Sequence, residues 1–150
     1  MRSFLVFAAS ALVLLLREAR AWPSFRFKIP NGDRVPCIDG MEACSPDGLC
    51  RGVGHTTCAG GVPSWNQFGL DLRANSAKWN RALCEKDSDG DGLANGVELG
   101  DPCCIWNYDD PSTYDLVDRT GPVSHPGSDK AAIANPQPLR CTWLTQLTLM

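Results

Sequence analysis

The sequence predicts a small α+β, disulfide-rich domain, in which short strands and loops surround one helix that leads into an EF-hand-like loop. Two observations predict this class. The chain of 150 residues holds eight cysteines, and an acidic pattern covers residues 87–98 between two of them. Small domains with a modest hydrophobic core are commonly stabilised by disulfides or bound metals. We therefore expect crosslinks and a metal-binding loop to organise this chain.

The acidic pattern at residues 87–98 fits the EF-hand consensus D-x-[DN]-x-[DN]-G-x5-E without a mismatch. A calcium ion takes about six to eight oxygen ligands, and alternate side chains of a coiled loop can point to one centre. Gly92 stands where the loop bends sharply. The predicted calcium ligands are Asp87, Asp89, Asp91, Leu93 through its backbone carbonyl, Asn95 at the position that often binds through a water, and Glu98.

Two other interpretations of this pattern are weaker. Magnesium prefers a strict octahedron and keeps several waters, so it fits a ligand-rich loop less well than calcium does. An acidic, glycine-rich surface turn would explain the composition. It would not explain acids at the first, third, fifth and twelfth positions with glycine at the sixth.

A helix is predicted immediately before the loop, at residues 75–86. Asn75 or Ser76 can cap its first turn, and the apolar residues between Trp79 and Leu83 fall on one helical face. After the loop, a helix can continue for only about one turn, because a glycine and a proline follow at residues 100 and 102. The loop therefore lacks the second helix of a complete EF-hand, and locally it resembles the calcium loops of thrombospondin type 3 repeats and dockerins.

The cysteines predict up to four disulfides, although the sequence does not select their connectivity. A bridge from Cys84 to either Cys103 or Cys104 would join the entrance of the loop to its exit. The adjacent Cys103 and Cys104 are expected to pair with different partners. Zinc is disfavoured, because the spacings between Cys37 and Cys58 exceed those of a zinc knuckle. The predicted disulfide cysteines are Cys37, Cys44, Cys50, Cys58, Cys84, Cys103, Cys104 and Cys141.

Residues 1–21 are predicted to be a secretory signal peptide, since a basic start precedes an apolar run and a small-x-small site. Residues 22–150 would then form one secreted domain. The signal peptide holds three of the 14 basic residues and one of the 17 acidic ones, which leaves 11 against 16 and a net charge of −5. An acidic chain without a basic patch is a poor partner for nucleic acid, and no membrane span is expected.

The remaining segments are predicted from local patterns. Alternation at residues 25–29 predicts a half-buried strand, and turns are expected at residues 30–33 and 46–48. Residues 64–72 are expected to form a buried anchor or a short helical turn. Short strands are expected around Leu116 and Val117, within an otherwise loop-rich arm.

No catalytic residues are predicted, and we expect the protein not to be an enzyme. His55 and His125 are the only histidines, and a catalytic zinc site typically needs three protein ligands. The G-x-S-x-G, H-E-x-x-H and C-x-x-C motifs are missing from the sequence. A small metal-dependent enzyme or redox protein that uses the two histidines is kept as the alternative.

These residues also carry a family resemblance. The chain resembles the temptin-like secreted proteins, which include a water-borne pheromone of sea slugs, over about residues 27–107. The block from Cys84 to Trp106 is the most specific part, and a looser similarity surrounds residues 124–127. The resemblance implies a secreted, disulfide-stabilised protein that acts by binding other proteins or a receptor.

The functional expectation is therefore a secreted, calcium-binding interaction module that serves as a signalling or pheromone-complex component. A calcium-dependent matrix or adhesion protein is a further alternative. Adhesive scaffolds usually repeat their domains, and this chain has a single one.

Overall fold

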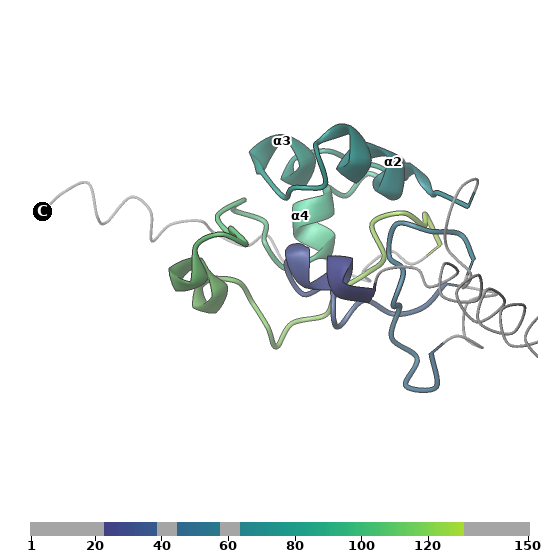
Figure 1. The fold of residues 1–150 in the computed structure, drawn as a ribbon, viewed down its shortest axis with the longest axis horizontal. Coiled ribbons are helices and arrows are strands. Elements are labelled where there is room, and N and C mark those ends of the chain that lie inside the picture. Colours follow the sequence, from purple (N-terminus) through teal and green to yellow (C-terminus); the bar gives the residue numbers. More distant parts are fainter. Residues whose placement is uncertain (1–22, 39–44, 58–63, 131–150) are drawn as a thin grey trace, which may run out of the picture.

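The computed structural model describes residues 23–38, 45–57 and 64–130. The predicted signal peptide at residues 1–21 lies outside these ranges, as do Cys44, Cys58 and Cys141. The described elements are η1 (Pro23–Lys28), α2 (Gln67–Ala74), α3 (Arg81–Cys84), α4 (Asn95–Glu98) and η3 (Pro111–Leu116). Figure 1 shows α4 near the centre of the molecule, with α2 and α3 along one side. None of the described helices is long and apolar enough to cross a membrane.

The expected short strands are not found among the described residues, so the α+β prediction is wrong there. That part of the chain has two isolated antiparallel bridges, between Pro36 and Leu49 and between His55 and Trp65. The residues around Leu116 form the 3-10 helix η3 instead, after Asp110 accepts a hydrogen bond from the Ser112 N–H at its start. Loops and short helices therefore make up the described fold.

The segment predicted as a strand at residues 25–29 is mostly the 3-10 helix η1. In a helix of this kind, side chains three residues apart lie on the same face. Lys28 accordingly places its ammonium over the ring of Phe25, 5.0 Å from the ring centre. Phe25 and Phe27 are both largely exposed, at 39% and 52%. Their alternation with basic residues therefore reflects an exposed helix with cation–π contacts, not a half-buried strand.

The helix predicted at residues 75–86 is confined to α3, and a second helix, α2, ends just before that range. Helix α2 ends at Ala74, and Ser76 and Ala77 then adopt the left-handed region with φ of 57° and 55°. A right-handed helix cannot continue through such residues. Helix α3 begins after Asn80, whose side chain accepts a hydrogen bond from the Leu83 N–H at 3.1 Å. Asn80 is therefore the cap, a role that the sequence had suggested for Asn75 or Ser76.

The hydrophobic core lies beneath these helices. Asn31 fixes part of it, because its side-chain amide donates 2.8 Å hydrogen bonds to the carbonyls of Leu99 and Asp118. As the sequence indicated, the helix on the exit side of the acidic loop is about one turn long: α4 covers the last four loop residues and ends before Leu99, and Gly100 follows with φ of 73°. The buried core residues are Ile29, Val35, Cys50, Val53, Phe68, Trp79, Leu83, Cys84, Leu99, Trp106 and Val117.

Candidate metal centre

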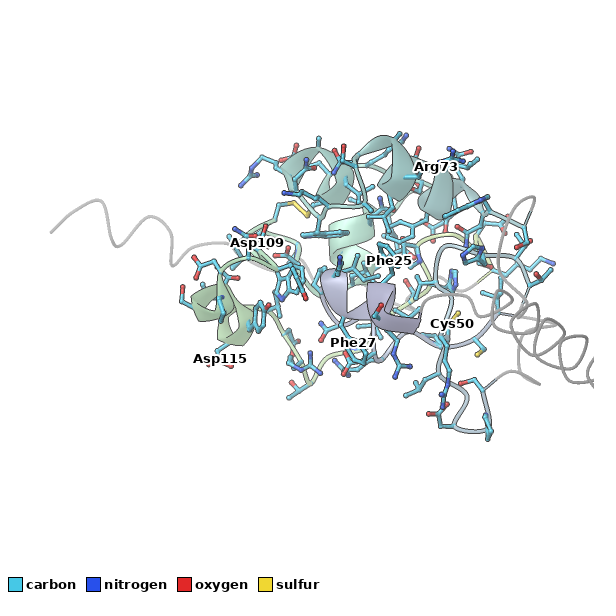
Figure 2. The ribbon with its side chains drawn as sticks, in the orientation of Figure 1. Phe25, Phe27, Cys50, Arg73, Asp109 and Asp115 are labelled. Atoms are coloured by element: carbon cyan, nitrogen blue, oxygen red, sulfur yellow. A yellow bond between two sulfur atoms is a disulfide. The ribbon has the colours of Figure 1, made fainter. Side chains whose placement is uncertain are left out.

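A disulfide joins the entrance of the acidic loop to its exit. Cys84, at the end of α3, is bonded to Cys104 with a Cα–Cα distance of 5.7 Å. This is one of the two pairings that the sequence left open, and Figure 2 shows it as a yellow bond near α3. Cys103 is also disulfide-bonded, and its partner lies outside the described residues. The two adjacent cysteines thus have different partners.

The bridge packs tightly against α4, where Gly96 leaves room for it. A Cβ atom at Gly96 would lie 2.3 Å from the Cys84 sulfur and 2.6 Å from the Asp101 carbonyl oxygen. Only a residue without a side chain therefore fits here without a shift of the helix. Together, the disulfide and this contact hold α4, which carries Asn95 and Glu98, against α3.

The three aspartates at the start of the loop hold the loop's own backbone, Asp87 with both carboxylate oxygens and Asp89 and Asp91 with one each. Asp87 accepts hydrogen bonds from the N–H groups of Gly90 at 2.7 Å and Gly92 at 3.0 Å. Asp89 accepts one from the Asp91 N–H at 3.2 Å, and Asp91 accepts one from the Leu93 N–H at 2.8 Å. Because local side-chain bonds define the turns, the loop is shaped before any ligand binds.

Carboxylate oxygens of these three aspartates converge. Asp87, Asp89 and Asp91 each offer a carboxylate oxygen, and these oxygens lie within 4.8 Å of one another. The Oδ2 atoms of Asp89 and Asp91 are buried and lack a hydrogen-bond partner within the part of the chain that the structure describes. Buried polar atoms are normally paired, so unpaired carboxylate oxygens at one point are a feature that a bound cation would explain.

Glu98 is the most unusual acid in the centre. Its side chain is fully buried in α4, and its Oε2 has no hydrogen-bond partner among the described residues. Burial raises its pKa to about 8, against a hydrogen bond from Ser124, while the negative charges of Asp89, Asp91 and Asp87 raise it further. A carboxyl group held in this way favours either a proton or a cation.

The predicted ligand Asn95 uses its side chain differently. Its Oδ1 accepts a hydrogen bond from the Ser88 N–H at 3.3 Å, and its Nδ2 donates to the Leu83 carbonyl at 2.7 Å and to Ser88 Oγ at 3.0 Å. In this arrangement Asn95 connects the end of α3 to the loop. Leu93 is half-buried, and a role for its carbonyl stays a prediction.

A segment distant in sequence closes over the centre, at residues 124–128. The Ser124 N–H donates to the Glu98 backbone carbonyl at 3.0 Å, and Ser124 Oγ donates to Glu98 Oε1 at 2.7 Å. The Ser128 N–H donates to the His125 carbonyl at 3.0 Å and closes the turn of this segment. The ligand consensus does not include Ser124. The looser family similarity around residues 124–127 was the only sequence signal for it.

The two histidines belong to different environments. His125 is fully buried, accepts a hydrogen bond from the Gly127 N–H through Nδ1, and has its pKa lowered to about 4 by burial. His55 packs against Trp65, with ring centres 4.6 Å apart and ring planes tilted by 34°. The acidic trio is the only cluster of three or more potential ligand side chains among the described residues, and it includes neither histidine.

The structure thus defines a small, crosslinked domain built around a loop rich in carboxylates. The chain belongs to the temptin family: residues 19–128 match the family described as Temptin C-terminal. It is also 41% identical to the protein named Temptin from Aplysia californica over 133 residues, which cover 89% of this chain and 96% of that protein. No solved structure matches the chain significantly. The resemblance inferred from the sequence is therefore confirmed.

Proposed function

We propose that this protein is a secreted, calcium-stabilised module that acts by binding other proteins in extracellular signalling. The observation that carries the calcium part is the burial of Glu98 with an unpaired oxygen beside three converging aspartates. The negative charges of the three aspartates act on Glu98 and add to the rise in its pKa. A bound calcium ion would supply the balancing positive charge and be coordinated by the unpaired oxygens.

In this proposal the metal has a structural role. The residues that would hold it are Asp87, Asp89, Asp91 and Glu98, and the bound cation supplies the positive charge that these acids lack. The chain's own contribution is to position the oxygens, through the disulfide between Cys84 and Cys104 and the hydrogen bonds of Asn95. A single loop of this kind is expected to bind in the range of extracellular modules, with a Kd of about 10⁻⁴–10⁻³ M.

The signalling part rests on family membership and on the sequence. The chain is similar to Temptin over most of its length, and its sequence predicts a signal peptide. The extracellular space is oxidising and rich in calcium, so it would favour disulfides between the cysteines and calcium binding by the acidic loop. Partners are therefore expected to be other secreted proteins or a receptor, and the pheromone role of temptin-like proteins is the corresponding signalling context.

Thermal unfolding tests the calcium part. At a calcium concentration about 100 times Kd, binding to the folded state alone would stabilise it by about 2.7 kcal/mol, which raises Tm. Glu98→Gln keeps the size of the side chain and removes its charge, so this variant should lose the calcium-dependent rise. Asp115→Asn removes an exposed acid in η3, on the side of the molecule shown at the left of Figure 2, and should keep the rise. An equal rise in all three proteins would contradict the proposal.

A further inference from the structure

Cys37 and Cys50 occupy diagonal positions of a short antiparallel pairing that is separate from the acidic loop, with Cys37 opposite Gly48 and Cys50 opposite Val35. Pro36 and Leu49 form an isolated bridge, and each cysteine follows one of them in the chain. The N–H of Cys37 donates to the opposite segment at 2.9 Å, and that of Cys50 does so at 2.7 Å. Because side chains alternate along such a pairing, both cysteines project from its same face.

The two thiols are near enough to interact electrostatically. Both are free in this structure, and Cys37 adds to the rise in the pKa of Cys50. Cys50, labelled in Figure 2, is fully buried in the core, and burial raises its pKa to about 11. Cys37 is half-buried and lines an open pocket of about 850 Å³, together with Asp89, Ser128 and Lys130. One thiol of the pair is therefore reached from solvent and the other is not.

We propose that Cys37 and Cys50 form a disulfide with each other in the mature protein, which closes residues 38–49 into a loop. Backbone hydrogen bonds hold the two segments side by side, and the alternation of side chains places both sulfurs on one face. The backbone has to adjust only to the diagonal offset between the two cysteines, since proximity and a shared direction of the side chains are the main requirements for a bridge.

The other cysteines are consistent with this pairing. Cys84 and Cys104 are bonded to each other, and Cys103 is bonded to a partner outside the described residues. Cys44, Cys58 and Cys141 lie outside the described residues. With Cys37 bonded to Cys50, these three cysteines and Cys103 form an even set of four.

The bond would form by thiol–disulfide exchange with a small-molecule disulfide such as oxidised glutathione. The accessible Cys37, as thiolate, attacks one sulfur of the oxidant and releases one thiol of the small molecule. Cys50 then gives up its proton and attacks the Cys37 sulfur of the mixed disulfide, which releases the second small-molecule thiol. The two protein thiols lose two electrons and two protons in total, and the oxidant is reduced to two thiols.

Peptide mapping of the full chain, refolded in a glutathione redox buffer without reduction afterwards, tests the pairing. Trypsin cuts after Arg34 and Arg51, and a protease specific for acidic residues cuts after Asp39, Glu42 and Asp47. Cys37, Cys44 and Cys50 then lie on three different peptides. We expect the peptide of residues 35–39 to be linked to that of residues 48–51. The link between the peptides of Cys84 and Cys104 serves as the internal control.

A Cys50→Ser variant gives a second readout that does not depend on a complete map. It should expose Cys37 to alkylation by iodoacetamide without reduction, whereas the unmodified protein should protect Cys37. Linkage of Cys50 to the peptide of Cys44, Cys58 or Cys141 in the refolded protein would overturn the proposal. Alkylation of Cys37 in the folded, unmodified protein would also overturn it.

Discussion

Ser124 Oγ donates a 2.7 Å hydrogen bond to Oε1 of Glu98 in the buried interior, across 26 residues of sequence. The same serine donates its N–H to the Glu98 backbone carbonyl. Two bonds therefore connect the segment at residues 124–128 to the last acid of the candidate centre. This relationship makes the centre a junction between the loop and a distant part of the chain.

Replacing Ser124 with alanine should weaken calcium binding. The hydroxyl stabilises the ionised form of Glu98, and a hydrogen bond to a charged group contributes about 1.5–3 kcal/mol. Calcium affinity should therefore fall by about tenfold or more. Ser112→Ala is the matched control, because Ser112 Oγ donates to the exposed Asp110. Calorimetric titration of both variants measures the difference, and equal affinities would show that the Ser124 bond is unimportant to the centre.

The pH dependence of stability should have a defined sign in the metal-free protein. Glu98 has a pKa of about 8 when folded and an ordinary value of 4.5. The folded state therefore holds a proton that the unfolded state releases, and this stabilisation is lost as pH rises from 4.5 to 8. His125 acts in the opposite direction below its ordinary pKa of 6.5, because burial lowers its pKa to about 4.

Between pH 6.5 and 8, only Glu98 of these two residues changes the stability with pH. Thermal unfolding in a chelator should show Tm decreasing over this window, and Glu98→Gln should remove the decrease. Saturating calcium should also remove it, because the cation takes the place of the proton. A Tm that is constant or increases in the chelator would contradict the assigned state of Glu98.

The Asn95 side chain offers a way to separate a ligand from a positioning residue. Its Nδ2 donates to the Leu83 carbonyl and to Ser88, and aspartate cannot replace these donors. Asn95→Asp should therefore lower the free energy of unfolding by about 1–3 kcal/mol in chelator, as expected when a buried acceptor loses its partner. Urea unfolding measures this. A variant as stable as the natural protein, with tighter calcium binding, would instead identify position 95 as a direct ligand.

Gly96→Ala should destabilise the domain through the disulfide. The added methyl group would lie 2.3 Å from the Cys84 sulfur, and overpacking of this kind costs about 1–3 kcal/mol. Gly52→Ala is a suitable control, since its nearest neighbour would be the His55 side chain at 3.6 Å. A lower Tm is expected for Gly96→Ala only. Similar Tm values for both variants would mean that α4 can shift away from the bridge.

The sequence was most informative where the chemistry is local. Ligand spacing in the acidic loop is a property of consecutive residues, so the converging oxygens of Asp87, Asp89 and Asp91 followed from the pattern. The end of α4 shortly before Gly100 followed from the same kind of local reasoning. Calcium itself stays a prediction.

Long-range contacts and competing local signals limited the rest. Asn75, Ser76 and Asn80 all have side chains that can cap a helix, and nothing in their spacing shows that the chain turns left-handed at Ser76. The contribution of Ser124 depends on a contact that folding creates between distant segments. The alternation of apolar and charged residues at 25–29 is compatible with a strand and with a 3-10 helix. The structure has the helix, in which Lys28 forms an exposed cation–π contact with Phe25.

Isothermal titration of the refolded protein with calcium, with and without Asp89→Ala, tests the central claim most directly. Asp89 has a buried, unpaired carboxylate oxygen within the acidic trio, so its removal should abolish the binding of one calcium ion per chain. Asp115→Asn should bind as the natural protein does. Calcium binding that persists in Asp89→Ala, or no binding by the natural protein, would contradict the account of this loop as a metal centre.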